Sequence, residues 1–232
     1  MSWLRKIFAW FESLKSPNVE PPKPTIPEES VPTDPAVASK ELWVPWAIQP
    51  KRKMGTSFTY PKGYPHGAIV HFTAGRDKTE QDALDSYEWG CDQGYVFFVI
   101  GPTGKLYQGF PLNKGGSHAG ISSWPGLGSG VSSKLVGIEI ACAGSLDSRG
   151  KSWFGVTYPQ DEIRKGFKKY TPEQEETLIK LLVWLKKNNP EVFDVQYILG
   201  HYEVSPGRKN DPGHSLSISM SELREKIARL TN

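Results

Sequence analysis

Residues 68–75, AIVHFTAG, join a short apolar run to a closing turn. The run is mostly apolar over 68–72, and Thr73, Ala74 and Gly75 close it. Such a run, bounded by a turn, is typical of a strand buried inside a sheet. The predicted strand carries His71 to the end of the sheet, where loops usually present functional side chains.

Other short apolar runs follow and are expected to join the same sheet. They cover residues 95–100, 135–141 and 195–199, and the turn at 101–104 leads into a hairpin strand at 105–108. Helical patterns alternate with these strands, at 79–89, from Thr171 to just before Pro190, and at 221–230. The alternation predicts an α/β fold with a central mixed β-sheet flanked by helices.

The helix that begins after Thr171 has a clear start in the sequence. Thr171 suits the N-cap, Pro172 the first helical position and Gln174 the return hydrogen bond of a capping box. The apolar positions then recur at helical spacing, at Leu178, Leu181, Leu182 and Leu185. This spacing predicts one apolar face that packs on the sheet.

The chain divides into three segments by composition. Residues 1–15, MSWLRKIFAWFESLK, place large apolar side chains on one side of a helix, which suits a membrane surface, a protein partner or the chain's own domain. Residues 16–40 are rich in proline and are expected to form an extended linker without fixed structure. A single globular domain is expected over 41–232.

Bulk composition narrows the class of protein. The net charge of +3 is too small to indicate nucleic acid binding. The two cysteines, Cys91 and Cys142, are too few for a disulfide framework and are expected to be reduced. The sequence shows neither a membrane-spanning apolar stretch nor a cleavable signal peptide. We expect a monomer.

Two of the five histidines stand at the ends of predicted strands and suggest a metal site. His71 ends the first strand, His201 follows the strand at 195–199, and Asp211 comes ten residues after His201. Two imidazoles and one carboxylate, with a fourth position open to water, form the ligand set of a catalytic zinc ion. Histidine pairs are also common as structural residues, so spacing alone leaves that alternative open.

Several motifs, in order, resemble the N-acetylmuramoyl-L-alanine amidases of the peptidoglycan-recognition type, a family that includes bacterial amidases and phage endolysins. The motifs are IVHFTAG at 69–75, GKLYQ at 104–108, SHAG at 117–120, VGIEI at 136–140, YTPEQ at 170–174 and GHYEVSPGRKNDPG at 200–213. The resemblance covers roughly residues 66–230. It implies hydrolysis of the amide bond between N-acetylmuramic acid and L-alanine in peptidoglycan.

The resemblance also implies roles for individual residues. Zinc would be bound by His71, His201 and Asp211. Glu139 would help to activate the attacking water, and Lys209 would stabilise the oxyanion. His118 would line the substrate groove, with zinc ligation by His118 as the alternative.

The two catalytic roles have independent support in the sequence. Glu139 is a charged residue inside an apolar strand, which is costly unless the carboxylate is paired or functional. Lys209 stands two residues before a predicted ligand, near enough to act on charge that develops there. A structural ion pair for Glu139 and a plain surface position for Lys209 are the alternatives.

One departure from the family pattern bears on the mechanism. Many members carry a histidine, often preceded by a tyrosine, where this chain has Phe97 and Val96. Tyr95 is one step away and would point to the opposite face of the strand. A tyrosine-assisted mechanism is therefore not expected here, and Glu139 becomes the favoured base.

Two other functions fit parts of the same pattern. A peptidoglycan-binding module without activity usually lacks a metal ligand, whereas all three candidates are present here. A zinc peptidase that cuts elsewhere in the stem peptide would use the same chemistry. For the place of action, we expect either release from the cytoplasm, as in an endolysin, or tethering at a membrane or partner through residues 1–15, ahead of recycling of muropeptides in the cytosol.

Overall fold

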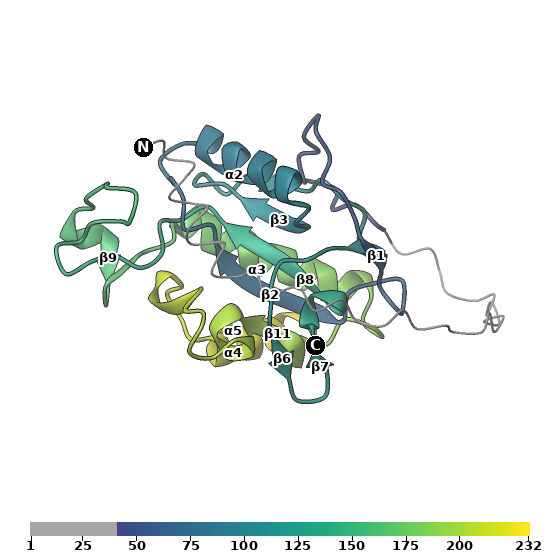
Figure 1. The fold of residues 1–232 in the computed structure, drawn as a ribbon. Helices are drawn as coiled ribbons and strands as arrows, with labels where there is room; N and C mark the ends of the chain where they lie inside the picture. The colour runs from purple at the N-terminus through teal and green to yellow at the C-terminus, as the bar shows by residue number, and fades with distance from the viewer. Residues whose placement is uncertain (1–40) are drawn as a thin grey trace, which may run out of the picture. The chain divides into compact units, whose positions relative to one another are not determined.

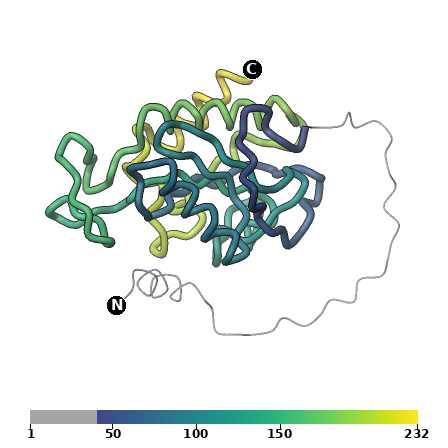
Figure 2. Tube along the Cα trace, turned by 90° about the horizontal axis from the view of Figure 1, so that it is seen from above, coloured from purple at the N-terminus to yellow at the C-terminus, as the bar shows by residue number. Residues whose placement is uncertain are grey.

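The computed structural model describes residues 41–232, and Glu41–Asn232 form one compact unit (Figures 1 and 2). The expected amphipathic helix at 1–15 and the proline-rich segment at 16–40 lie outside the described residues. The predictions made for them are therefore neither supported nor contradicted by the structure.

The described chain contains short strands, three longer helices and several short helical turns. The strands are β1 (Phe58–Thr59), β2 (Gly67–Phe72), β3 (Phe97–Ile100), β4 (Leu106–Tyr107), β5 (Lys114–Gly115), β6 (Ser123–Trp124), β7 (Gly128–Ser129), β8 (Leu135–Ile140), β9 (Ile163–Arg164), β10 (Phe167–Lys168) and β11 (Ile198–Gly200). The α-helices are α2 (Glu80–Gln93), α3 (Pro172–Asn188), α4 (His201–Val204) and α5 (Met220–Thr231).

Five strands form the central sheet, in the order β11-β2-β8-β3-β4. The neighbours are parallel except for β3 and β4, which form an antiparallel hairpin. The sheet is therefore mixed and flanked by helices, and this prediction from the sequence is confirmed. β2 lies between β11 and β8, so the strand that carries His71 is an inner strand of the sheet.

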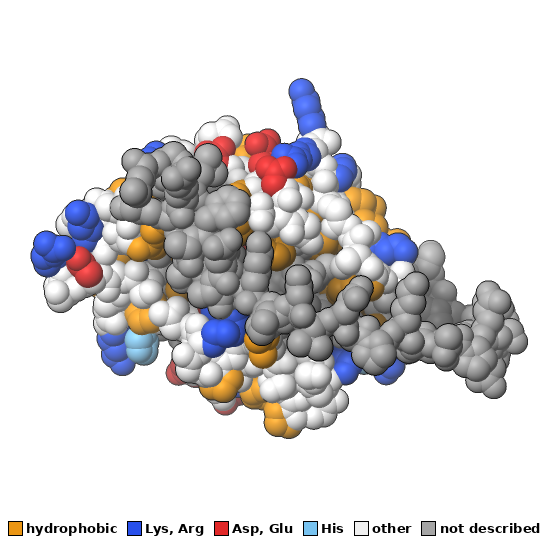
Figure 3. All heavy atoms as spheres, in the orientation of Figure 1, with side chains coloured by type: hydrophobic (Ala, Val, Ile, Leu, Met, Phe, Trp, Pro, Cys, Tyr) orange, Lys and Arg blue, Asp and Glu red, His pale blue; other side chains and the backbone are white. Residues whose placement is uncertain are grey.

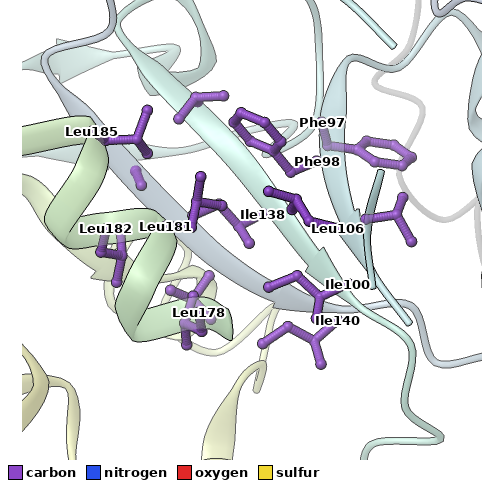
Figure 4. Close-up of a cluster of buried hydrophobic side chains, with 14 of the residues drawn as sticks. Phe97, Phe98, Ile100, Leu106, Ile138, Ile140, Leu178, Leu181, Leu182 and Leu185 are labelled. Carbon is purple, nitrogen blue, oxygen red and sulfur yellow. The ribbon is translucent and has the colours of Figure 1, made fainter. Parts of the chain in front are cut away.

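One face of the sheet is apolar and is covered by α3 and α5. The α3 leucines Leu178, Leu181, Leu182 and Leu185 are fully buried and pack toward Ile138 and Ile140 of β8 (Figure 4). The capping box predicted for the start of α3 is present, with Thr171 accepting a hydrogen bond from the Gln174 amide at 3.1 Å. The cap and the apolar face together fix where α3 begins and which side of it meets the sheet.

The opposite face carries the functional side chains. Strand alternation places His71 on the same side of β2 as Ile69, and Glu139 on the same side of β8 as Leu135. Ile69 and Leu135 belong to a second, smaller apolar cluster that includes Ala119, Leu127, Val131, Leu199 and Val204. The loop around 119–131 and helix α4 therefore cover this part of the sheet.

Some element boundaries differ from those predicted. The strand expected over 195–199 begins only at Ile198, because Val195–Tyr197 form a 3₁₀ turn in which Asp194 accepts a hydrogen bond from the Gln196 amide at 2.8 Å. The strand expected from Tyr95 begins at Phe97. The first helix runs beyond its predicted end at residue 89 to Gln93, where Gly94 ends it with a φ of 71°.

A long connection between β8 and α3, residues 145–169, is named the arm here. It contains the β9–β10 hairpin and projects from the sheet in two perpendicular views (Figures 1 and 2). In the space-filling view, lysine, arginine and acidic side chains gather at its end (Figure 3). At its base, Tyr158 donates a hydrogen bond of 2.8 Å to the buried Asp77.

The packing of α3 on the sheet predicts the effect of shortening one of its leucines. Leu181 has no exposed surface, so we expect Leu181→Ala to lower the free energy of unfolding by about 2–5 kcal/mol, measured by urea denaturation. Glu176→Ala, at an exposed position of the same helix, is the control and should change it by no more than about 0.5 kcal/mol. Equal effects of both substitutions would contradict this account of the core.

Candidate active site

The three predicted metal ligands converge at one place. His71 Nδ1 lies 2.9 Å from His201 Nδ1 and 2.9 Å from Asp211 Oδ2, and His201 Nδ1 lies 3.0 Å from the same Asp211 oxygen. All three side chains are buried. Residues separated by 130 and 140 positions from His71 thus present one donor atom each to a common point.

The sheet explains how two of the ligands meet. β11 and β2 are parallel neighbours, and Gly200 is paired with Val70, so both strands deliver a histidine at the same edge. His201 opens the short helix α4, in which Glu203 accepts a hydrogen bond of 2.7 Å from the Gly200 amide. Arg224 of α5 forms an ion pair with Glu203 at 3.1 Å. Helix α5 therefore anchors the turn that presents His201.

The third ligand comes from the loop that follows α4. The amide of Tyr202 donates a hydrogen bond of 3.0 Å to the carbonyl of Asp211, which closes the loop onto the start of α4. Asn210 donates a hydrogen bond of 3.2 Å to Ser145, the first residue of the arm. The loop is held on both sides, and Asp211 points into the cluster.

The donor set fits a zinc ion in both spacing and chemistry. Tetrahedral bonds of about 2.0–2.1 Å would separate the ligand atoms by about 3.3 Å, close to the observed 2.9–3.0 Å. His201 Nε2 lies 3.0 Å from the carbonyl oxygen of Ala119. Arg208 Nη2 also lies near Nε2, but at 3.4 Å it is farther away than the carbonyl oxygen. Because that oxygen only accepts, Nε2 donates its proton to it, and Nδ1 turns its lone pair toward the cluster. A cation between them would stabilise lone pairs that converge on one buried point, so these residues could hold a metal ion.

The protonation states of the cluster agree with a cation site. Burial, together with the nearby His201, lowers the pKa of His71 to about 4, so this imidazole is neutral at physiological pH. Burial alone would raise the pKa of Asp211, but His201 and His71 outweigh it and hold that pKa below its usual range. A neutral imidazole and an ionised carboxylate are the forms that bind a metal ion.

Glu139 lies beside the cluster, on the strand next to His71. The two residues are directly paired across β8 and β2. Its Oε2 atom is buried and has no hydrogen-bond partner among residues 41–232. Burial, with a contribution from Asp211, raises the pKa of Glu139 to about 8, and Lys209 partly opposes the shift. A buried carboxylate oxygen without a partner is costly, and such atoms are concentrated at functional sites.

Lys209 lies in the same electrostatic environment. Its backbone amide donates a hydrogen bond of 3.1 Å to the carbonyl of Ser205, which fixes the turn before Asp211. Burial lowers the pKa of the Lys209 ammonium, while the charges of Asp211 and Glu139 act in the opposite direction. The structure thus brings both predicted catalytic residues close to the three predicted ligands.

His118 lies directly behind His71. Its Nδ1 is 3.1 Å from His71 Nε2, and its Nε2 is 2.8 Å from the carbonyl oxygen of Leu135. Both ring nitrogens therefore have partners within the protein. The predicted contact with substrate is not tested by this arrangement.

Several supporting residues were not assigned a role from the sequence. Arg208 donates hydrogen bonds to the carbonyls of Ala119, at 2.6 Å, and Ile121, at 2.8 Å. Tyr170 donates a hydrogen bond of 3.1 Å to the carbonyl of His71. Both residues stand inside the quoted motifs, which signalled a functional region but not these contacts.

The arm also contacts the turn that follows His71. The indole of Trp153 donates a hydrogen bond of 2.5 Å to the carbonyl of Ala74, and the side chain is 42% exposed. Ala74 has a φ of 52°, which is unusual for a residue other than glycine. An exposed aromatic side chain is therefore fixed close to the strand end that carries His71.

The N-acetylmuramoyl-L-alanine amidase family profile matches residues 61–214, which is more than half of the chain. The chain therefore belongs to the N-acetylmuramoyl-L-alanine amidase family and is an enzyme of that family. All the residues of the candidate site lie within the matched range. A search of curated proteins finds no significant match.

Solved structures share the fold. A selenomethionine derivative of AmpD aligns with a TM-score of 0.54 at 21% identity, over 84% of this chain and 100% of AmpD. The amidase AmiD from E. coli, in complex with anhydro-N-acetylmuramic acid-L-Ala-D-gamma-Glu-L-Lys, aligns with a TM-score of 0.52 at 22% identity, over 70% of this chain and 58% of AmiD. AMPDH3 from Pseudomonas aeruginosa, in complex with an anhydromuramic pentapeptide, gives 0.51 at 19% identity, over 76% and 64%.

The raised pKa of Glu139 predicts a pH dependence of stability in metal-free protein. The unfolded chain ionises this carboxyl near pH 4.5, whereas the folded chain keeps its proton until about pH 8. Stability should therefore fall as pH rises between these values, by a few kcal/mol at most. Glu139→Gln removes this ionisable group. The variant should therefore become more stable relative to the wild type as pH rises from about 4.5 to about 8. Urea unfolding of both proteins with chelator present measures the difference, and parallel pH profiles would contradict it.

Proposed function

We propose that this enzyme hydrolyses the amide bond between N-acetylmuramic acid and L-alanine in peptidoglycan, and that it depends on zinc. One observation carries the proposal. The buried cluster of His71, His201 and Asp211 lies beside a carboxylate, Glu139, whose Oε2 has no partner among the described residues. Membership of the amidase family supports the choice of reaction. The complexes of AmiD and AMPDH3 with muramyl peptides support the choice of substrate.

His71, His201 and Asp211 would hold the zinc ion. When bound, zinc polarises the scissile carbonyl and lowers the pKa of a water molecule toward neutrality. Asp211 carries one negative charge and the zinc ion two positive charges. The ion together with its three ligands would therefore keep a net positive charge. That charge is available to stabilise the oxyanion that forms when water attacks the amide.

Glu139 is suited to move the proton of the attacking water. As the water oxygen bonds to the carbonyl carbon, the carboxylate accepts a proton. It then donates that proton to the alanine nitrogen as the carbon–nitrogen bond breaks. The products are a carboxyl group on the muramic acid and a free amino group on L-alanine. A pKa near 8 in the metal-free site would be lowered by a neighbouring cation, toward the value that favours proton transfer in both directions.

Lys209 is suited to stabilise the same oxyanion. Its ammonium lies close enough to Asp211 and Glu139 for their charges to affect its pKa. A positive charge fixed beside the carbonyl acts without further reorganisation during the reaction. Lys209 also keeps Glu139 more easily ionised, because it partly opposes the rise in the pKa of that carboxyl.

Two other functions share parts of this site. A binding module without activity needs neither three converging ligands nor a buried carboxylate beside them, so the geometry favours catalysis. A peptidase that cuts elsewhere in the stem peptide would use the same catalytic groups. Only the products distinguish this peptidase from the proposed amidase.

Digestion of purified peptidoglycan tests the proposal directly. We expect intact glycan strands and free L-alanine amino termini, detected by mass spectrometry and lost with chelator or with His201→Ala. Glu139→Gln should lower kcat by about 10²–10⁴-fold and Lys209→Met by about 10²–10³-fold, both with zinc retained.

The controls separate the alternatives. His214→Phe changes an exposed histidine that contacts Phe167 at a ring distance of 5.7 Å and should leave activity unchanged. Cleavage within the stem peptide would show that the enzyme is a peptidase and not the proposed amidase. A wild-type protein that sediments with the wall but releases nothing would indicate a binding module.

We also propose that residues 1–15 hold the enzyme at a membrane surface, with the proline-rich segment as a spacer that lets the domain reach the wall. The support is the apolar side of the sequence in 1–15. Among the described residues, no helix is long and apolar enough to span a bilayer.

Co-sedimentation with anionic liposomes tests this attachment. The full chain should bind, and the fragment 41–232, which corresponds to the compact unit, should not. Replacing Trp3 and Phe8 with glutamate in the full chain should abolish binding. Equal binding of the full chain and the fragment would rule the attachment out.

A further inference from the structure

A chain of three hydrogen-bonding groups runs behind the metal cluster. It starts at His71 Nε2, continues 3.1 Å away at His118 Nδ1, and ends where His118 Nε2 meets the carbonyl oxygen of Leu135 at 2.8 Å. The two rings are nearly perpendicular, at 84°, with centroids 5.3 Å apart. Each ring nitrogen of His118 therefore has one partner.

The end of this chain determines where its protons lie. The carbonyl oxygen of Leu135 has no hydrogen to give, so the proton of that contact belongs to His118 Nε2. A neutral imidazole carries a single proton, and in His118 that proton is on Nε2. His118 Nδ1 is then an acceptor, and it receives the hydrogen of His71 Nε2. His71 Nδ1 is left with its lone pair, and this atom faces His201 and Asp211.

The position of His118 is fixed by its surroundings. A Cβ atom at residue 137 would lie 2.8 Å from His118 Cγ, so glycine leaves the space that the ring occupies. Ser132 Oγ accepts hydrogen bonds from the backbone amides of His118, at 3.3 Å, and Ala119, at 3.0 Å. The ring is therefore held both from the side of the sheet and through its own backbone.

The same loop orients the other metal-ligating histidine. His201 Nε2 lies 3.0 Å from the carbonyl of Ala119, the residue that follows His118. Two adjacent residues thus serve both imidazoles, one through a side chain and the other through a backbone carbonyl. In each case the hydrogen bond is made at Nε2 and leaves Nδ1 for the metal.

We propose that His118 is a positioning residue that fixes the tautomer and the ring orientation of His71 for zinc binding, in place of the substrate contact implied by the family resemblance. The inference rests on the proposed zinc site. Hydrogen bonds to the free nitrogen of a metal-ligating histidine typically change metal affinity by about 10–100-fold. His118 therefore acts through His71 and needs no contact with the substrate.

Nitrogen-15 NMR of the histidine rings tests the proton arrangement in the full chain, with and without zinc. We expect His71, His118 and His201 to carry their proton on Nε2 in both states. A proton on Nδ1 of His118 or of His71 would overturn the proposal. Because the metal-free protein is also measured, the result does not depend on whether the wild type binds zinc.

Zinc affinity tests the consequence, by competition with a chromophoric chelator. His118→Phe keeps a ring over Gly137 but has no nitrogen, and it should weaken zinc binding by about 10–100-fold. His118→Gln offers an amide oxygen to His71 and an amide hydrogen to Leu135, and should stay within a few-fold of the wild type. His214→Phe, at an exposed histidine outside the cluster, is the matched control and should bind zinc normally.

The outcomes separate this proposal from the proposed function. Wild-type zinc affinity in His118→Phe, with only KM raised, would identify a substrate contact and overturn the positioning role. A wild-type protein that binds no zinc would overturn the proposed function, while the NMR result would still report on the His118–His71 hydrogen bond. If His118→Phe fails to fold by circular dichroism, a loss of zinc affinity in His118→Gln as large as 100-fold would overturn the proposal.

Discussion

The structure depends on three electron-rich atoms that meet at one buried point. His71 Nδ1, His201 Nδ1 and Asp211 Oδ2 lie 2.9–3.0 Å from one another. His201 donates its ring proton from Nε2 to a backbone carbonyl, so its Nδ1 turns a lone pair toward the other two atoms. His201 therefore has no proton at Nδ1 to donate to His71 or Asp211. The surrounding contacts hold these groups together, and a cation bound between them would relieve their repulsion. The hydrogen bonds from Arg224 to Glu203 and from Tyr170 to the His71 carbonyl serve this purpose.

Strand alternation keeps this polar site separate from the main core. Ile138 and Ile140 point toward α3, whereas Gly137 and Glu139, their neighbours in β8, lie on the other face. The apolar face supplies the stability, because α3 and α5 bury their leucines there. The functional face has a smaller apolar cluster of its own and can carry a glycine and a carboxylate beside it.

The sequence was most informative where local pattern and chemistry coincide. His71 and His201 could be predicted because each follows a short apolar strand, and Glu139 because a carboxylate inside such a strand is unusual. The start of α3 was evident from Thr171, Pro172 and Gln174, and the structure confirms that cap. The 3₁₀ turn at Val195–Tyr197 was missed, because β-branched and aromatic residues favour a strand while the Asp194 side chain stabilises a turn.

Contacts between distant segments were beyond reach of the sequence. His118 and His71 are 47 residues apart, and the sequence around each residue does not indicate that the two rings would be in contact. The same holds for Arg208, which meets the Ala119 carbonyl 89 residues away. The arm is a third case, since Trp153 and Ala74 are separated by 79 residues. Motif order located the site, but the hydrogen bonds that orient the ligands arise only from the fold.

Glu139 shows why the site carries a cost to stability. Burial raises its pKa to about 8, so in the metal-free protein the carboxyl keeps a proton that the unfolded chain would release at physiological pH. A hydrogen-bond donor beside Oε2 would relieve this cost, yet none is present among the described residues. Such a donor would also stabilise the ionised form and weaken it as a base. The absence of such a donor among the described residues therefore fits a group that has to accept a proton and then return it.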